Sequence, residues 1–311
     1  MSCRVVGMGE LLWDLLPGGR EVGGAPANFA FHAGSMGAEA WVVSRVGRDE
    51  AGAELLEQLH RMGMSTGCVE RDDSLPTGTV EVEVGVGGEP RFRIREGVAW
   101  DNLRGEAAAV EIVGGADAIC FGTLAQRCVP SRSAIRRLLR AARPHALKVL
   151  DVNLRQEYHS PEVIRESIEL ADVVKVNEQE LPRMAEALGL PRDPATCLGR
   201  MAADHGLRAV VMTRGGAGSL VLADGRWADH PGVPTQVRDT VGAGDSFTAA
   251  VTLGLLSGWD AERVSHAANQ VASHVASCPG ATPRLPDSLR SLFLPSSPHP
   301  LMTTVDPRHP L

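Results

Sequence analysis

Short apolar segments alternate with segments of helical periodicity along most of this chain, and this alternation limits the fold more than any other feature of the sequence. The apolar segments occupy residues 5–8, 40–46, 118–122, 148–151, 173–177, 207–213 and 219–222. Strands that are apolar on both faces and are separated by helices predict a parallel sheet covered by helices on both sides. The sequence therefore predicts the α/β class, with ligands beyond the carboxyl ends of the strands.

Polar residues come directly after several of the apolar segments. They are Asp14, Asn153, Asn177 and Thr213. Because the carboxyl ends of parallel strands meet at one edge of a sheet, we expect these side chains to lie along the edge that binds ligands.

Residues 76–103 have a different pattern, which predicts a small β element beside the main sheet. Residues 79–84 alternate strictly between polar and apolar side chains, a glycine-rich turn follows, and residues 91–95 alternate again. This pattern is typical of a two-stranded hairpin. Since a lone hairpin is only marginally stable in water, it must pack against the main domain, a bound substrate or a second subunit.

Length, charge and cysteine spacing exclude several classes of protein. The 311 residues suit one large domain with a small appendage, and the Pro-rich residues 295–311 are predicted to be a disordered tail. The net charge of −7 argues against nucleic-acid binding. Six scattered cysteines indicate neither a zinc site nor a disulfide framework. Neither a membrane span nor a signal peptide is recognisable, so we expect a cytoplasmic protein.

Residues 241–247 form a glycine-rich motif that points to phosphate chemistry. Gly242 and Gly244 lead into an apolar segment that should be a helix, and the N–H groups of a helix N-terminus favour an anion. Asp245 would lie in the first turn, where a carboxylate can take the proton from an attacking hydroxyl. The same position equally suits an acidic residue that only complements the helix dipole. A Walker A loop is excluded, because neither lysine of the chain has the required context.

The segment Asp239-Thr240-Val241-Gly242-Ala243-Gly244-Asp245 resembles the C-terminal signature of the PfkB, or ribokinase-like, carbohydrate kinases. Residues 23–37 resemble the N-terminal signature of the same family, in the family's order. Shorter matches are residues 46–49 with Gly52, residues 76–78, Asn177 with Glu180, and residues 213–215 and 280–281. The resemblance covers roughly residues 4–290. It implies a kinase domain of residues 1–294, built as a three-layer sandwich with a mostly parallel central sheet and a small β lid. The lid would be formed by residues 10–22 and 76–103.

The resemblance assigns catalytic roles to the C-terminal signature. Asp245 would be the base that deprotonates the accepting hydroxyl. The N–H groups of Gly242, Ala243 and Gly244 would form an anion hole for the γ-phosphate of ATP. Catalysis would then rest on positioning and charge stabilisation.

Positions that match sugar-binding residues of the family come from distant segments. They are Asp14, Gly23, Gly24, Asn28, Arg95, Asn153 and Arg155. A carboxylate such as Asp14 can accept hydrogen bonds from two adjacent hydroxyls, which suits a polyol. A local cap for Asp14 or Asn28, and a surface salt bridge for Arg155, remain alternatives.

Other matches imply a nucleotide and its metal. The positions assigned to ATP are Lys175, Asn177, Thr213, Gly215, Gly216, Gly218 and Asn269, although Lys175 equally suits a structural role. Asn177 and Glu180 match the family's Asn-x-x-Glu motif, which implies Mg²⁺ held through water. Asp239 and Val241 match part of a monovalent-cation site. Arg284 replaces a small polar ligand of that site, so an arginine could stand in for K⁺.

Three stretches, residues 9–17, 121–127 and 151–155, favour a fructokinase within the family. The implied reaction is ATP-dependent phosphorylation of fructose to fructose 6-phosphate. Ribose, 2-keto-3-deoxygluconate or a nucleoside as substrate, and a non-catalytic sugar-binding or sensing protein, remain alternatives. A dinucleotide-dependent enzyme is disfavoured, since no Gly-x-Gly-x-x-Gly follows the first strand. The lid also offers a surface for a homodimer.

Overall fold

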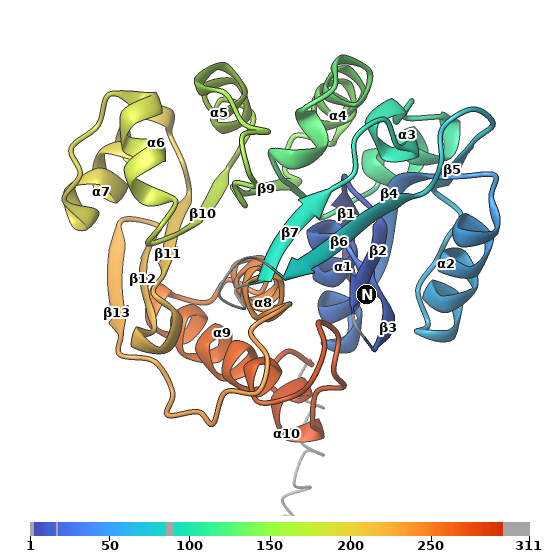
Figure 1. Ribbon diagram of the computed structural model, residues 1–311. Coiled ribbons are helices and arrows are strands. Elements are labelled where there is room, and N and C mark those ends of the chain that lie inside the picture. Colours follow the sequence, from blue (N-terminus) through green and yellow to red (C-terminus); the bar gives the residue numbers. More distant parts are fainter. Residues whose placement is uncertain (1–2, 17, 85–89, 295–311) are drawn as a thin grey trace, which may run out of the picture.

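The computed structural model describes residues 3–16, 18–84 and 90–294, which form a large sheet with helices on both faces (Figure 1). The strands of this sheet are β1 Arg4–Met8, β4 Glu39–Gly47, β5 Val69–Asp72, β8 Ala118–Phe121, β9 Leu147–Asp151, β10 Val173–Asn177, β11 Ala209–Thr213, β12 Ser219–Ala223 and β13 Arg226–His230. Their order is β13-β12-β11-β10-β9-β8-β1-β4-β5. The strands from β11 to β5 pair in parallel, and β12 and β13 add antiparallel at one edge. The predicted α/β class is confirmed.

The helices cover the sheet in two layers, because neighbouring side chains of a strand point to opposite faces. Val5 and Val173 pack on one face against α1, α8 and α9, while Val6 and Val174 pack on the other against α3 to α7. The first layer consists of α1 Ala25–Ser35, α8 Ala243–Leu256 and α9 Ala261–Ala276. The second consists of α3 Ala107–Gly114, α4 Val129–Ala141, α5 Pro161–Ile168, α6 Leu181–Leu188 and α7 Pro194–His205. The short α10 Asp287–Arg290 lies beside α9.

A second sheet forms the lid, with the order β3-β2-β6-β7. Its strands are β2 Leu12–Leu16, β3 Gly19–Gly23, β6 Gly78–Val84 and β7 Pro90–Ile94. The predicted hairpin β6–β7 is stabilised by a second hairpin, since β2 pairs with β6 in parallel. Trp13 and Val22 of the lid pack with Leu55 of α2 Glu50–Arg61. The glycine-rich turn at residues 85–89 and the tail at residues 295–311 lie outside the described residues.

Asp14 does not follow a strand of the main sheet, and that expectation was wrong. The structure places it inside the lid strand β2, paired with Glu21 of β3. The brief alternation of Trp13, Asp14 and Leu15 is a strand pattern, and it turns the carboxylate to the face opposite Trp13. Asp14 therefore belongs to the lid.

The end of the segment that the sequence groups with the lid lies in the main core. Val98 and Trp100 are fully buried, and Ala99–Asn102 forms a 3₁₀ turn. A Cβ atom at Gly78 would stand 2.4 Å from Nε1 of Trp100, so β6 passes directly over this indole. Trp100 thus supports the base of the lid.

Arg127 holds the point where the lid rejoins the main domain. Its guanidinium lies 4.0 Å from the ring centre of Trp100 and 4.6 Å from that of Tyr158. It pairs with Asp101 over 2.7 Å and donates to the carbonyl of Arg95 over 2.6 Å. The hydroxyl of Tyr158 donates to Glu96 over 2.8 Å. The stacked, ion-paired Arg127 therefore fixes residues 95–101, which form the lid hinge.

Two of the shorter matched segments bind each other. The carboxylate of Asp49 accepts from the backbone N–H of Gly52 and Thr77, both over 2.8 Å, and from the hydroxyl of Thr77 over 2.5 Å. The N–H of Gly47 donates to that hydroxyl over 3.0 Å. This network joins the loop before α2 to the strand that enters the lid.

Among the described residues, no helix has the length and apolar character needed to cross a membrane.

Candidate active site

The candidate site lies at the carboxyl end of β1, where the direction of strand succession reverses. Strand β1 has β8 on one side and β4 on the other. Such a switch point leaves a crevice beyond the strand ends in α/β folds. Helices α1 and α8 pack against each other there, and each contributes a polar side chain from its first turns.

Asp245 lies in the first turn of α8, as predicted. Gly242 caps the helix with a φ of 77°, a left-handed conformation that favours glycine. Burial raises the pKa of Asp245 to about 6, the charge of Asp151 adds to this, and the bond from Asn28 opposes it. A surface dipole partner would show neither the burial nor the bond. The carboxyl is therefore suited to exchange a proton near neutral pH.

Asn28 of α1 orients this carboxylate. Its Nδ2 donates to Oδ2 of Asp245 over 2.8 Å, and its side chain is almost completely buried. Its Oδ1 is also buried and has no hydrogen-bond partner among the described residues. Asn28 can thus hold the base and accept from a ligand hydroxyl at the same time.

The turn before α8 is packed tightly against the loop after α9. A Cβ atom at Gly242 would lie 2.1 Å from the carbonyl oxygen of Ala281, which accepts from Nε2 of His32 over 2.9 Å. Only a glycine fits there. The first N–H groups of a helix have no partner within it, so Gly244 and its neighbours can receive an anion. The N–H of Ala243 already contacts the carbonyl of Thr240 over 3.3 Å.

Asp239 ties the same two loops together. One carboxylate oxygen accepts from the N–H of Val241 over 3.0 Å, and the other accepts from the N–H of Gly280 over 3.1 Å. Arg284 is exposed, and its carbonyl accepts from His274 over 3.0 Å. Asp239 therefore has a structural function that needs no cation.

Asp14 brings the lid close to the candidate site, since the charge of Asp245 acts on its carboxyl group. Burial raises the pKa of Asp14 to about 6, Arg155 opposes this, and the charges of Glu21 and Asp245 add to it. A Cβ atom at Gly23 would stand 2.2 Å from Oδ2 of Asp14, and one at Gly24 would stand 2.4 Å from the carbonyl oxygen of Glu10. Gly23 therefore allows the end of β3 to pass close to Asp14, and Gly24, the next residue, allows the chain to pass close to the backbone of Glu10.

Glu10 is a site residue that the sequence reasoning missed. It is 3% exposed, and burial raises its pKa to about 7, with Arg155 opposing and Asp245 adding to the shift. One of its carboxyl oxygens has no hydrogen-bond partner among the described residues. A glutamate two residues after the end of the first strand was the available signal.

The segment after β9 brings further polar groups close to Glu10, Asp14 and Asp245. Asn153 has a φ of 41° and lines a small cavity with Glu10 and Asp151. Arg155 is exposed, and its positive charge lowers the pKa values of Glu10, Asp14 and Asp245. Arg95 is exposed at the lid hinge, and its described contacts are made by its backbone. The structure thus joins Arg155 to the cluster but not Arg95.

Lys175, Asn177 and Glu180 lie at the end of β10. Glu180 accepts from the N–H groups of Leu154 and Asn177 over 2.9 and 2.8 Å, and Oδ1 of Asn177 accepts from the N–H of Glu180 over 2.9 Å. These oxygens are already bonded, so they suit Mg²⁺ held through water better than direct ligation. The described residues contain no group of three or more His, Cys, Asp or Glu side chains that could hold a metal ion.

The predicted nucleotide positions form a separate stretch along β11 and α9. Thr213 ends β11, and Gly215 and Gly216 follow on the surface. Gly218 has another role, because a Cβ atom there would lie 2.0 Å from the carbonyl oxygen of His230. Asn269 donates to the hydroxyl of Ser219 and to the carbonyl of Ser265, both over 2.8 Å. The amide of Asn269 therefore joins α9 to β12.

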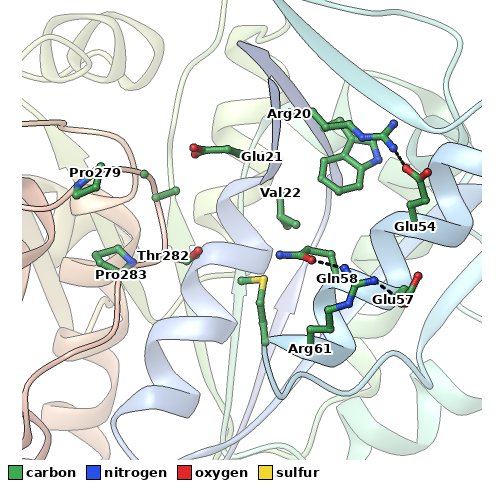
Figure 2. A pocket seen from close by; sticks show the side chains of 14 residues that line it. Arg20, Glu21, Val22, Glu54, Glu57, Gln58, Arg61, Pro279, Thr282 and Pro283 are labelled. Atoms are coloured by element: carbon green, nitrogen blue, oxygen red, sulfur yellow. Dashed lines mark hydrogen bonds and ion pairs between the residues drawn. The ribbon is translucent and has the colours of Figure 1, made fainter. Parts of the chain in front are cut away.

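Figure 2 shows a cavity between β3, α2 and residues 279–283. Its volume is about 600 Å³. The two arginines in the wall of this cavity are neutralised by carboxylates of the same wall: Arg20 contacts Glu54, and Arg61 pairs with Glu57 over 2.5 Å. Asp14, Asn28 and Asp245 are not part of its wall. This cavity is distinct from the candidate active site.

Comparison with known proteins identifies a family over most of the chain. Residues 18–288 match the model of the pfkB family carbohydrate kinases. An uncharacterized sugar kinase of Pyrococcus horikoshii is 30% identical over 307 residues, which cover 92% of this chain and 94% of that protein. A fructokinase of Oryza sativa subsp. japonica is 30% identical over 319 residues, covering 94% and 98%.

Solved structures agree with the fold. The Pyrococcus horikoshii sugar kinase in complex with ATP superposes with a TM-score of 0.78 at 29% identity and covers 89% of this chain and 94% of that one. A fructokinase of Vibrio cholerae O395, solved with fructose, ADP and a calcium ion, gives a TM-score of 0.75 at 23% identity and covers 94% and 99%. The ribokinase-like architecture is thereby confirmed.

Proposed function

The chain belongs to the pfkB family of carbohydrate kinases, and from that premise we propose that it transfers the γ-phosphate of ATP to fructose, giving fructose 6-phosphate and ADP. The observation that carries the assignment of roles is the bond between Asn28 and Asp245, 2.8 Å long. It joins the predicted sugar-binding signature to the predicted catalytic signature, 217 residues apart in sequence.

Asp245 acts as the general base in this proposal. Its carboxylate takes the proton of the accepting hydroxyl while the hydroxyl oxygen bonds to the γ-phosphorus. The bond from that phosphorus to the bridging oxygen breaks, and ADP leaves with the electron pair. The N–H groups around Gly242, Ala243 and Gly244 stabilise the charge of the transferring group. A base with a pKa near 6 is ionised at neutral pH and so is ready to accept the proton.

The sugar is held between lid and core. Asp14 accepts from its hydroxyls, Oδ1 of Asn28 accepts from the hydroxyl next to Asp245, and Asn153 and Arg155 close the cleft from the other side. Arg155 supplies the positive charge among Glu10, Asp14 and Asp245. Arg95 can reach the sugar only if the lid moves, since its side chain is exposed at the hinge.

ATP lies along Thr213, Gly215 and Gly216 with its phosphates toward α8. Asn177 and Glu180 would hold Mg²⁺ through water, and the ion neutralises phosphate charge when bound. Closure of the lid excludes water, which favours transfer to the sugar over hydrolysis. The outer strands of the lid also provide a surface for a homodimer, which light scattering of the purified protein tests.

Fructose is favoured over the alternatives because a fructokinase is among the relatives that match nearly the whole chain. Ribose, 2-keto-3-deoxygluconate and a nucleoside fit the same chemistry. A non-catalytic sugar-binding protein is disfavoured, since the base, its Asn28 partner and the glycines around them are all in place.

An ADP-release assay over fructose, ribose, 2-keto-3-deoxygluconate and nucleosides tests the proposal. We expect sugar-dependent turnover that is highest with fructose. Replacement of Asp245 by Asn should reduce kcat by about 10²–10⁴-fold, the usual contribution of a general base. Absence of turnover with every sugar contradicts the kinase assignment, and near-native turnover of Asp245→Asn contradicts the base.

A further inference from the structure

A buried chain of polar contacts runs beneath the first turn of α8. Nζ of Lys175 on β10 lies 3.1 Å from Oδ1 of Asp151 on β9. The other oxygen of Asp151 accepts from the hydroxyl of Thr248 over 2.8 Å, and that hydroxyl also lies 3.0 Å from the carbonyl oxygen of Gly244. Lys175 and Asp151 are 6% and 4% exposed. The contacts therefore connect a buried ion pair to the backbone that surrounds the anion hole.

The ammonium group also packs directly against that backbone. A Cβ atom at Gly244 would stand 3.3 Å from Nζ of Lys175, which is tighter than ordinary van der Waals contact. A glycine at this position therefore lets the ammonium group come close to the first turn of α8. Lys175 thus lies next to Gly244, whose N–H the resemblance assigns to the anion hole for the γ-phosphate.

The charges around the ammonium are mostly negative. Asp151 forms a buried ion pair with Lys175 over 3.1 Å, and the charges of Glu180 and Asp245 also act on the ammonium group. The lysine therefore stays charged. A buried charge acts strongly on its neighbours because little water screens it. The only other lysine of the chain, Lys148, lies 3.7 Å from Asp172 at the opposite end of β9.

We propose that Lys175 is a positioning residue for phosphoryl transfer, whose fixed ammonium beneath Gly244 places positive charge under the anion hole and holds the first turn of α8 in place. This inference rests on the proposed function, and it assigns Lys175 an action through the backbone of Gly244 instead of a direct contact with ATP. A charge that is fixed before the reaction needs no reorganisation as the phosphate charge develops.

The competing explanation is that Lys175 only neutralises Asp151. A charge-conserving double variant, Lys175→Met with Asp151→Asn, separates the two explanations. It removes the ammonium without leaving a buried carboxylate unpaired, which the single variant Lys175→Met would do. The matched control is Lys148→Met with Asp172→Asn, which removes the other lysine and its partner far from the site.

The double variant should also leave the acid–base behaviour of Asp245 nearly unchanged. The charged and polar groups that face Asp245 are Asn28 from α1, Asp14 from β2, Glu10 after β1, Asp151 from β9, Arg155 after β9 and Lys175 from β10. Lys175 lowers its pKa and Asp151 raises it, so removal of both charges has opposing effects. A loss of rate would then report on the anion hole.

We expect the double variant to retain the native melting temperature to within a few degrees and to lose roughly 100-fold in kcat, comparable to removal of one stabilising group. Its Kd for ATP, measured by calorimetry with Mg²⁺, should rise about tenfold while its Kd for ADP stays native. The control double variant, Lys148→Met with Asp172→Asn, should change neither kcat nor the Kd for ATP. Native kcat and a native ratio of the two Kd values in the folded double variant overturn the proposal. The Kd ratio is informative even if no sugar is phosphorylated, which would contradict only the proposed function.

Discussion

The amide of Asn28 donates to the carboxylate of Asp245 over 2.8 Å, from the second turn of α1 to the first turn of α8. The bond favours the ionised form of Asp245, while burial favours the protonated form, and the balance sets a pKa of about 6. Because a general base must be ionised, activity should fall as the pH decreases through about 6.

Replacement of Asn28 by Ala removes this bond and should raise the pKa of Asp245. The acid limb of kcat/KM should move to higher pH by about one unit, since a hydrogen bond to a charged group contributes roughly 1.5 kcal/mol. A pH–rate profile checks this. Asn102→Ala, which removes a bond of 2.7 Å to Asp72 away from the site, serves as the control. An acid limb that stays in place in Asn28→Ala would show that Asp245 is not the titrating base.

The position of Gly242 can be tested by comparison with another glycine of the same backbone conformation. Gly242 and Gly258 have φ values of 77° and 72°. A Cβ atom at Gly242 would lie 2.1 Å from the carbonyl oxygen of Ala281, whereas one at Gly258 would meet no atom of the described residues within 4 Å. Gly258→Ala should cost only the strain of a left-handed residue, about 1 kcal/mol. Gly242→Ala should in addition displace the anion hole and reduce kcat by more than about tenfold. Equal kinetics of the two variants would contradict this account.

Glu10 should make the protein less stable as the pH rises. Its folded pKa, about 7, lies above its ordinary value of 4.5, so its contribution is fully present below pH 4.5 and is lost as the pH rises through 7. Glu10→Gln removes this dependence. The gain in the free energy of unfolding of the variant over the native protein should therefore be larger at pH 8 than at pH 5, by on the order of 3 kcal/mol at most. Thermal unfolding at both pH values measures it, with the exposed Glu169→Gln as control. A Glu10→Gln variant whose advantage is no larger at pH 8 than at pH 5 would refute the assignment.

Arg127 should be important for stability at the lid hinge. Arg127→Met leaves the buried Asp101 without its ion-pair partner and should lower the free energy of unfolding by about 3–5 kcal/mol. Arg200→Met breaks an exposed pair with Asp204 and should cost less than about 1 kcal/mol. Urea unfolding compares the two, and similar losses would argue against a structural role for the hinge arginine.

The α/β class and most strands of the main sheet could be predicted because each of these strands is a short apolar segment that alternates with a segment of helical periodicity. The edge strands β5 and β13 were missed, since they are short and carry exposed polar residues such as Arg71 and Arg226. Asp14 was misplaced for a related reason: three alternating residues are too few to reveal a strand without its partner β3.

The helix start at Asp245 was predictable from local glycines, but the burial of the charged side chains around Asp245 was not. The burial of Glu10, and of Lys175 beneath Gly244, depends on contacts between distant segments that no local pattern records. The sequence places Lys175 near the candidate site, but only the packing of β10 against α8 shows that its ammonium group lies beside Gly244.

The stacked hinge has a practical consequence for spectroscopy. Tyr158, whose ring lies against Arg127 and whose hydroxyl bonds Glu96, is the single tyrosine of the whole chain. Protein grown with fluorinated tyrosine would therefore carry one ¹⁹F resonance, located at the junction of lid and core. The molecule already contains its own site-specific probe of lid movement, with no engineered label required.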